Sequence, residues 1–248
     1  MAQSMPICEN LSTITDTNFA TQTPPNGYSS GCSATPERYQ ITIYEMGFCT
    51  SNPISGGLDR STCSTTYESS GGQTVDLAGS TSVTLDETNA TRPASDTYNY
   101  GFMVISNTFG LRGSVETATN TWVSNGTDFD GINTNTKSSG ASVNFEDTLT
   151  SFGSGGCTSS GSATMSLGTM SAIVTNGSLS EATNCTGVTR IVGAFAPTTP
   201  YEITDKTTAL KITFSVTNKG MSILPMPGQV GVRQMASGPF EMEITVIE

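Results

Sequence analysis

Six cysteines carry the most distinctive chemistry in this sequence. They are Cys8, Cys32, Cys49, Cys63, Cys157 and Cys185. No two of them form a C-x-x-C motif and the chain has no histidine, which argues against a zinc site. Most of them border turn-rich segments, and the local pairings 8–32, 49–63 and 157–185 would each stabilise the fold by about 3 kcal/mol through loop closure. Disulfides are therefore the favoured interpretation, and free buried thiols are the alternative.

Closely spaced carboxylates are the second set of residues that could do chemistry. The pairs are Asp86/Glu87, Asp128/Asp130, Glu146/Asp147 and Glu241/Glu243. A glycosidase needs two carboxylates that face each other across a cleft, and such clefts are usually lined by aromatic residues, whereas Trp122 is the only tryptophan here. The lack of histidine excludes Ser-His and Cys-His catalysis, and no nucleotide-binding glycine motif is present. The sequence thus predicts neither an enzyme nor a bound cofactor.

One short string resembles a metal loop. In "DFDGIN", the side chains of Asp128, Asp130 and Asn133 would present oxygen ligands at the spacing that Ca²⁺ favours. The string lacks the complete calcium-loop pattern and its closing glutamate, and Asp130-Gly131 is also a common turn dipeptide. A turn is the favoured interpretation, with calcium binding as the alternative.

Period-two alternation identifies the elements that would position these residues. Apolar residues alternate with polar ones in "YQITIYEMG" (39–47), "TALKITFSVT" (208–217) and "FEMEITVI" (240–247), while "TYNYGFMVIS" (97–106) is apolar on both faces. Turn signals recur every 8–15 residues, and no convincing helix is readable. We therefore expect an all-β chain, an antiparallel β-sandwich of jelly-roll-like type. Its expected core residues are Ile41, Ile43, Tyr100, Phe102, Val104, Leu210, Ile212, Phe214, Met242 and Ile244.

The N-terminal part differs from the rest of the chain. Residues 1–37 show no clean periodicity, and "TQTPPNGYSSGCSATPE" is rich in proline and glycine. We expect residues 1–37 to form an irregular N-terminal arm and residues 38–248 to form the sandwich, with two subdomains as a variant of this arrangement.

Charge and targeting signals limit the partners and the location. The net charge is −11, and the 10 basic residues are scattered, so neither nucleic acid nor an anionic membrane is an expected partner. No signal peptide or membrane-spanning run is visible, and the five N-x-S/T sequons, at Asn10, Asn89, Asn125, Asn176 and Asn184, are interpreted as chance matches. A disulfide-capable β-protein without an export signal could reach an oxidising environment through cell lysis, as phage virion proteins do.

Three segments carry a resemblance to a known group of proteins. "YQITIYEMGFCTSNP", "SGPFEMEITV" and "YEITDKTTALKITFSVTNKGMSI" resemble uncharacterised structural proteins of marine tailed phages. The resemblance implies a virion protein, a head decoration or cement protein on the virion surface. Its partners would be phage capsid proteins and further copies of itself, as a homo-oligomer. It assigns no role to any residue. A bacterial surface filament or adhesin subunit and a jelly-roll major capsid protein are the alternatives.

Overall fold

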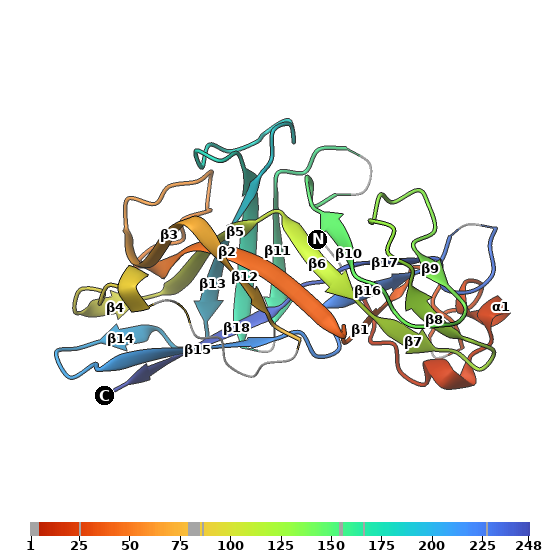
Figure 1. The fold of residues 1–248 in the computed structure, drawn as a ribbon. Coiled ribbons are helices and arrows are strands. Elements are labelled where there is room, and N and C mark those ends of the chain that lie inside the picture. Colours follow the sequence, from red (N-terminus) through yellow and green to blue (C-terminus); the bar gives the residue numbers. More distant parts are fainter. Residues whose placement is uncertain are drawn as a thin grey trace.

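The expected all-β architecture is confirmed. The computed structural model describes residues 5–24, 26–78, 85, 87–153, 156–165, 167–226 and 228–248. Strands make up 48% of it and helices 4%, and every pairing between named strands is antiparallel (Figure 1). The helical residues lie in short turns, namely η1 (Leu11–Thr13), α1 (Asp16–Phe19) and η2 (Glu87–Asn89).

One large antiparallel sheet of eight strands organises the molecule. Strand β2 is at its centre and pairs with β3 along one edge and with both β5 and β6 along the other. Ile43 is opposite Ile105 in β5, and Gln40 is opposite Gly110 in β6, so β5 and β6 together act as one long strand beside β2. The eight strands are β2 (Arg38–Cys49), β3 (Cys63–Asp76), β5 (Tyr100–Ser106), β6 (Thr108–Arg112), β10 (Phe145–Thr148), β11 (Ser160–Met165), β12 (Gly168–Thr175) and β13 (Arg190–Pro197).

The sheet forks at Asn107, the residue between β5 and β6. Beyond it, β10 pairs with β6, whereas β13 pairs with β5 and is followed by β12 and β11. The buried Asn107 amide donates to the carbonyl oxygens of Leu149 and Val188, at 3.1 and 3.2 Å, one on each branch. Because buried backbone carbonyls must be hydrogen-bonded, a side chain with two donors suits this branch point.

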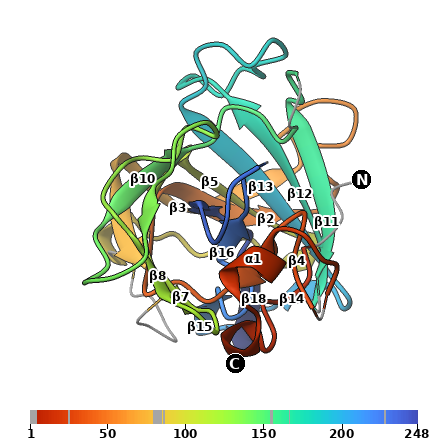
Figure 2. The ribbon, with the colours of Figure 1, turned by 90° about the vertical axis from the view of Figure 1, so that its right-hand side faces the viewer.

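Smaller sheets cover the concave side of the large one. Figure 2 shows the main sheet curled around β16, with α1 and the β7–β8 hairpin closing one end. The pairs β4–β14 and β15–β18 lie together at the other end, near the C-terminus (Figure 1). The strands are β1 (Cys32–Ala34), β4 (Asp96–Tyr98), β7 (Ser114–Glu116), β8 (Thr121–Ser124), β9 (Thr136–Lys137), β14 (Tyr201–Ile203), β15 (Ala209–Ser215), β16 (Met221–Leu224), β17 (Gln234–Ser237) and β18 (Glu241–Ile247).

Strand β5 is buried on both faces, as its sequence predicted. Met103 and Ile105 belong to the main core on the concave side of the sheet. Phe102 and Val104 point the other way, into a smaller cluster with Ile54 of the 50–62 loop. The 50–62 loop therefore covers the convex face of the sheet near Phe102 and Val104. The rest of this face along β2 carries polar side chains.

The expected core residues fall into two groups. Ile41, Ile43, Phe102, Val104, Phe214 and Met242 are buried, whereas Tyr100, Leu210, Ile212 and Ile244 are partly buried. Three of the partly buried residues belong to the two-stranded β15–β18 ribbon. A two-stranded ribbon at the periphery is covered by fewer neighbours than a strand inside a large sheet. The alternation therefore predicted which side chains face inward but overestimated how completely they are buried.

The N-terminal segment expected as an irregular arm packs against the rest of the chain. Its apolar side chains enter the main core, and β1 pairs with β16. The same core extends as far as Met242, so the described residues share one main hydrophobic cluster and give no support to two subdomains. The N-terminal core residues are Leu11, Ile14, Phe19, Tyr28 and Cys32.

Candidate functional site

A row of polar side chains follows the outer face of β2. Ile41 and Ile43 point into the core, and the alternation of the strand turns Gln40, Thr42 and Tyr44 to the opposite face, where they are half-exposed. This face is open along the first half of β2 because the covering loop packs only over the other end of the strand.

Two adjoining hollows lie along this row and form what we call the outer groove. The first has a volume of about 460 Å³ and is bordered by Gln40 and Thr42 of β2 and by Ser106 of β5. The second, of about 300 Å³, is bordered by Tyr44 and by Arg190 of β13. Since Arg190 is the strand partner of Ser106, the hollows are neighbours on one surface.

Hydroxyl and amide groups make up much of the groove. The Thr42 and Thr74 hydroxyls are 2.9 Å apart across β2 and β3. The Arg38 guanidinium donates to the Gln40 side-chain oxygen, and the two side chains lie over Gly110, where a Cβ atom would approach Gln40 to 3.2 Å. The glycine therefore leaves room for this polar pair on the groove floor.

Two carboxylates from different sequence pairs meet at the groove. Glu146 of β10 and Asp128 both line the first hollow, together with Asn144. The Glu146 backbone N–H donates to Asp128 Oδ1 at 2.8 Å, which fixes the Asp128 loop to β10. The Glu146 carboxylate and the Asn144 amide are exposed and make no side-chain hydrogen bond with another described residue. They are available to a ligand.

The second hollow contains a stacked pair. The Arg190 guanidinium carbon lies 3.6 Å from the centre of the Tyr44 ring, which is close enough for a cation–π contact. A Cβ atom on Gly72, a residue with a φ of +72°, would approach the same ring to 2.8 Å. The glycine in β3 thus allows Tyr44 to lie flat against the sheet beneath Arg190.

The other predicted carboxylate pairs do not form facing pairs. Glu146 and Asp147 are consecutive in β10, so Glu146 is exposed while Asp147 is buried. Glu241 is buried and pairs with Lys219 at 2.7 Å, whereas Glu243 is exposed. Asp86 lies outside the described residues. The only two predicted carboxylates that the described structure brings into one groove are therefore Asp128 and Glu146.

Asp147 forms a buried polar contact beneath the groove. Its Oδ2 accepts hydrogen bonds of 2.6 Å from both the backbone N–H and the hydroxyl of Ser237. Burial raises the pKa of Asp147, and this effect outweighs the two hydrogen bonds. Burial, together with the charge of Asp147, also raises the pKa of Tyr39, whose hydroxyl donates to the Gly238 carbonyl at 2.6 Å. These groups connect β2 and β10 with the end of β17 and the glycine that follows it.

The "DFDGIN" string forms a turn. Asp130 accepts hydrogen bonds from the backbone N–H groups of Asn133 and Ile132, which lower its pKa, and from the Asn133 side-chain amide. Asp128 instead accepts from Glu146, as described above. Among the described residues, no three acidic, cysteine or histidine side chains gather as a metal site would need. The oxygens proposed as calcium ligands thus hold their own loop together.

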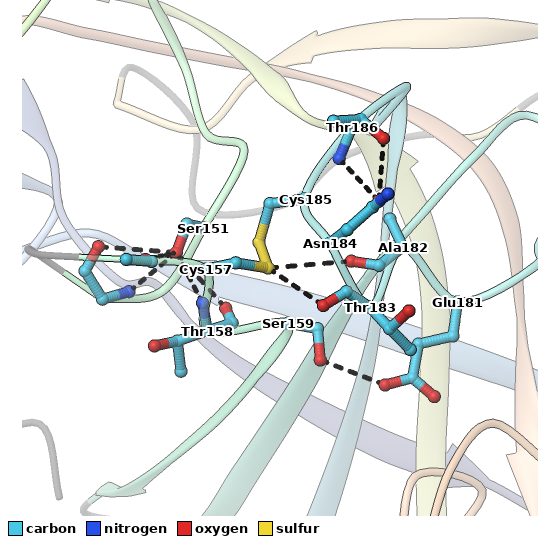
Figure 3. Close-up of a disulfide and its surroundings, with 12 residues drawn as sticks. Ser151, Cys157, Thr158, Ser159, Glu181, Ala182, Thr183, Asn184, Cys185 and Thr186 are labelled. Carbon is cyan, nitrogen blue, oxygen red and sulfur yellow. Dashed lines mark hydrogen bonds between the residues drawn. A yellow bond between two sulfur atoms is a disulfide. The ribbon is translucent and has the colours of Figure 1, made fainter.

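All six cysteines form the three predicted disulfides, Cys8–Cys32, Cys49–Cys63 and Cys157–Cys185. Figure 3 shows the last of these, which joins the segment before β11 to the 176–187 loop. The Ser159 hydroxyl donates to Glu181 at 3.0 Å, and Asn184 closes a turn by accepting from Thr186. Gly177, Ser178 and Leu179 of the same loop border the second hollow. The disulfide therefore anchors one wall of the groove.

Asp16 is an important buried residue that the sequence did not single out. Its Oδ1 accepts from the Trp122 indole N–H at 2.8 Å and from the Thr117 hydroxyl at 2.6 Å, and its Oδ2 accepts from Asn120. These partners are about a hundred positions away in the sequence, so no local pattern could have revealed the contact. The cluster has a structural function, because it attaches α1 to the β7–β8 hairpin.

Comparisons with protein-family models, with curated proteins and with solved structures found no match to this chain. Among the described residues, no helix is long and apolar enough to cross a membrane.

Proposed function

We propose that this chain is a non-enzymatic structural protein of a phage virion, a head decoration or other surface accessory that assembles with copies of itself and with capsid proteins. The observation that carries the proposal is the outer edge of β11, with which no other strand in the described part of the chain pairs. A protein whose task is assembly needs a surface that can join another chain, and β11 offers one.

Strand β11 pairs with β12 along all six of its residues, from Ser160 to Met165. It is the last strand on its branch, and no other described strand pairs with its outer edge. Its sequence, "SGSATM", has no charge and no proline. Soluble proteins usually protect such edges with lysine, proline or a bulge, because free backbone groups accept strands from other chains. An unprotected edge therefore suits addition of a strand from a partner.

Two further features support a virion surface. Three disulfides resist unfolding outside a reducing cell, which suits a protein exposed after lysis. A ligand that binds only the assembled shell stabilises that shell by mass action. The outer face of the main sheet presents hydroxyls rather than a large apolar patch, so the free protein can remain soluble before it binds.

The test uses a charge placed on the edge strand. We expect Thr164→Lys to reduce self-association in sedimentation velocity and to reduce co-sedimentation with purified particles of the parent phage. Thr169→Lys is the matched control, because Thr169 is the exposed strand partner of Thr164 on β12, which is paired on both sides. If Thr164→Lys and Thr169→Lys self-associate and co-sediment with particles to the same extent, the β11 edge has no role in assembly. Self-association by wild type without binding to particles would contradict the virion assignment.

A further inference from the structure

We propose that the outer groove binds a neutral oligosaccharide chain through its side chains. This inference goes beyond assembly and does not depend on it, because the groove and the β11 edge are different surfaces. Its basis is the shape of the groove, the kinds of groups in it and their charge.

The groove is long and open. Its polar row runs from Arg38 to Tyr44 along β2, and six residue steps in a strand span about 20 Å. Hollows of about 460 and 300 Å³ follow each other along this line. A small ligand would be enclosed on few sides in such a place, whereas an extended chain could contact side chains from β2, β5, β6, β10 and β13 at once.

The groups in the groove exclude an added peptide strand. The backbone of β2 is already paired with β3 on one edge and with β5 and β6 on the other, so a peptide cannot be held by main-chain hydrogen bonds there. Apolar peptide side chains would find little to pack against, because Ile41 and Phe145 are almost fully buried beneath the polar layer. Recognition must therefore use side-chain hydroxyls, amides and carboxylates.

These side chains match the hydroxyl groups of a sugar, which are donors and acceptors at once. Glu146 offers acceptors, and the Asn144 and Gln40 amides offer both kinds of group. Glu146 and Asn144 have no side-chain partner among the described residues, so a ligand would not have to displace a protein contact there. The Arg190 guanidinium covers the Tyr44 ring at one end of the groove and offers its own planar outer face to a sugar ring.

The charge of the groove favours a neutral chain. The groove is lined by four carboxylates, Asp128, Glu146, Glu45 and Glu68, and by two arginines, Arg38 and Arg190. Glu45 is paired with Arg60, and the whole protein carries a net charge of −11. A sulfated or phosphorylated polymer would be repelled by this potential. A neutral polyhydroxyl chain satisfies the same hydrogen bonds without that repulsion.

The proposal can be tested by titration calorimetry with a fixed panel of linear hexasaccharides. The neutral probes are built of glucose, mannose, galactose or N-acetylglucosamine, and a sulfated heparin-type hexasaccharide is the anionic probe. We expect at least one neutral probe to bind, and the sulfated probe to bind more weakly than it. Binding by none of the neutral probes, or stronger binding by the sulfated one, overturns the proposal.

Variants locate the binding on the groove. Glu146→Ala removes an unpaired acceptor and should weaken binding by roughly tenfold, while Thr108→Trp should fill the first hollow and abolish binding. Glu202→Ala is the control, because Glu202 is likewise an exposed strand glutamate but lies on β14. Thermal melting shows whether each variant is folded. If both folded groove variants bind as tightly as Glu202→Ala, the groove is not the site.

Discussion

Three buried acidic side chains, Asp16, Asp147 and Glu241, join parts of the chain that are distant in sequence. Asp16 is satisfied by neutral donors around Trp122, Asp147 by Ser237, and Glu241 by the charge of Lys219. A buried carboxylate is costly unless it is hydrogen-bonded or paired, so each of these contacts has to be complete. Each of these three carboxylates therefore connects two separate parts of the fold.

The Asp16 cluster gives the first prediction. Asp16→Ala would leave the Trp122 indole N–H and the Thr117 and Asn120 donors without their acceptor. We expect a loss of about 3 kcal/mol or more in the free energy of unfolding. Urea denaturation is the measurement, with Glu116→Ala on the exposed side of β7 as a control that should cost less than about 0.5 kcal/mol. Similar losses of unfolding free energy in Asp16→Ala and Glu116→Ala would show that the Asp16 hydrogen bonds do not stabilise the fold.

The raised pKa of Asp147 gives a prediction about pH. The folded state binds a proton on this carboxyl more readily than the unfolded chain, whose value is near 3.8. Its contribution to stability is therefore present in full below pH 3.8 and is lost as the pH rises through the folded value. Asp147→Asn keeps an acceptor for Ser237 but cannot titrate. We expect wild type to gain stability relative to this variant when urea unfolding is measured at pH 4.5 instead of pH 7. A difference in stability that is the same at both pH values would contradict this assignment.

At the scale of elements, the loops that carry disulfides determine what the large sheet can expose. The 50–62 loop, closed by Cys49–Cys63, covers one end of the convex face with Ile54. The 176–187 loop, held by Cys157–Cys185, stands beside the groove and leaves its floor open. The convex face of the sheet thus packs into a hydrophobic cluster beneath the 50–62 loop and forms a polar groove beside the 176–187 loop.

Removing Cys157–Cys185 tests the role of the second loop. A Cys157→Ser/Cys185→Ser double variant should lose about 3 kcal/mol or slightly more of stability, because the bridge closes a separation of 28 residues. Non-reducing peptide mapping should still find the other two bridges. The matching Cys49→Ser/Cys63→Ser variant, with a separation of 14, should lose a similar amount but leave the groove wall in place. Unchanged urea midpoints in both variants would contradict a stabilising role.

The N-terminal segment gives a prediction about a whole element. Deleting residues 1–36 would remove the Asp16 cluster, strand β1 and the buried side chains of Phe19 and Tyr28. We expect the truncated chain to lose cooperative unfolding in circular dichroism and calorimetry. A Cys8→Ser/Cys32→Ser variant should lose only about 3 kcal/mol, which separates the bridge from the packing. A truncated chain that unfolds cooperatively near the wild-type temperature would show that the segment is dispensable for folding.

At the scale of the whole molecule, the main core fills the concave side of the sheet, and the two proposed binding surfaces lie elsewhere on it. The main core occupies the concave side, while the outer groove lies on the convex face along β2 and β6. The β11 edge is on the other branch of the fork, with β13 and β12 between it and β5. A molecule arranged in this way can join a neighbour through its edge and still present its groove.

This separation predicts that the two surfaces act independently. Thr164→Lys should weaken self-association and leave the affinity for the neutral hexasaccharide unchanged, and Glu146→Ala should have the opposite pattern. Sedimentation velocity and titration calorimetry on the same preparations provide the comparison. If either variant alone reduces both properties, the edge and the groove belong to one site.

Features that depend on near neighbours could be predicted from the order of the amino acids. The alternation around Ile41 and Ile43 identified a strand and its buried face, the apolar run at 102–105 identified a strand covered on both sides, and short separations predicted all three disulfides. Side-chain direction in a strand repeats every two residues, and closing a short loop costs little entropy, so both kinds of information are local.

Contacts between residues that are distant in the sequence became visible in the fold. It brought Asp128 and Glu146 to the same hollow, although each had been grouped with its own neighbour in the sequence, and it placed Asp16 against Trp122. It also packed the irregular N-terminal segment into the core. These outcomes depend on strand order and on the fork at Asn107. Strand pairing is chosen by the combined burial and hydrogen bonding of the whole chain, and a local pattern does not record it.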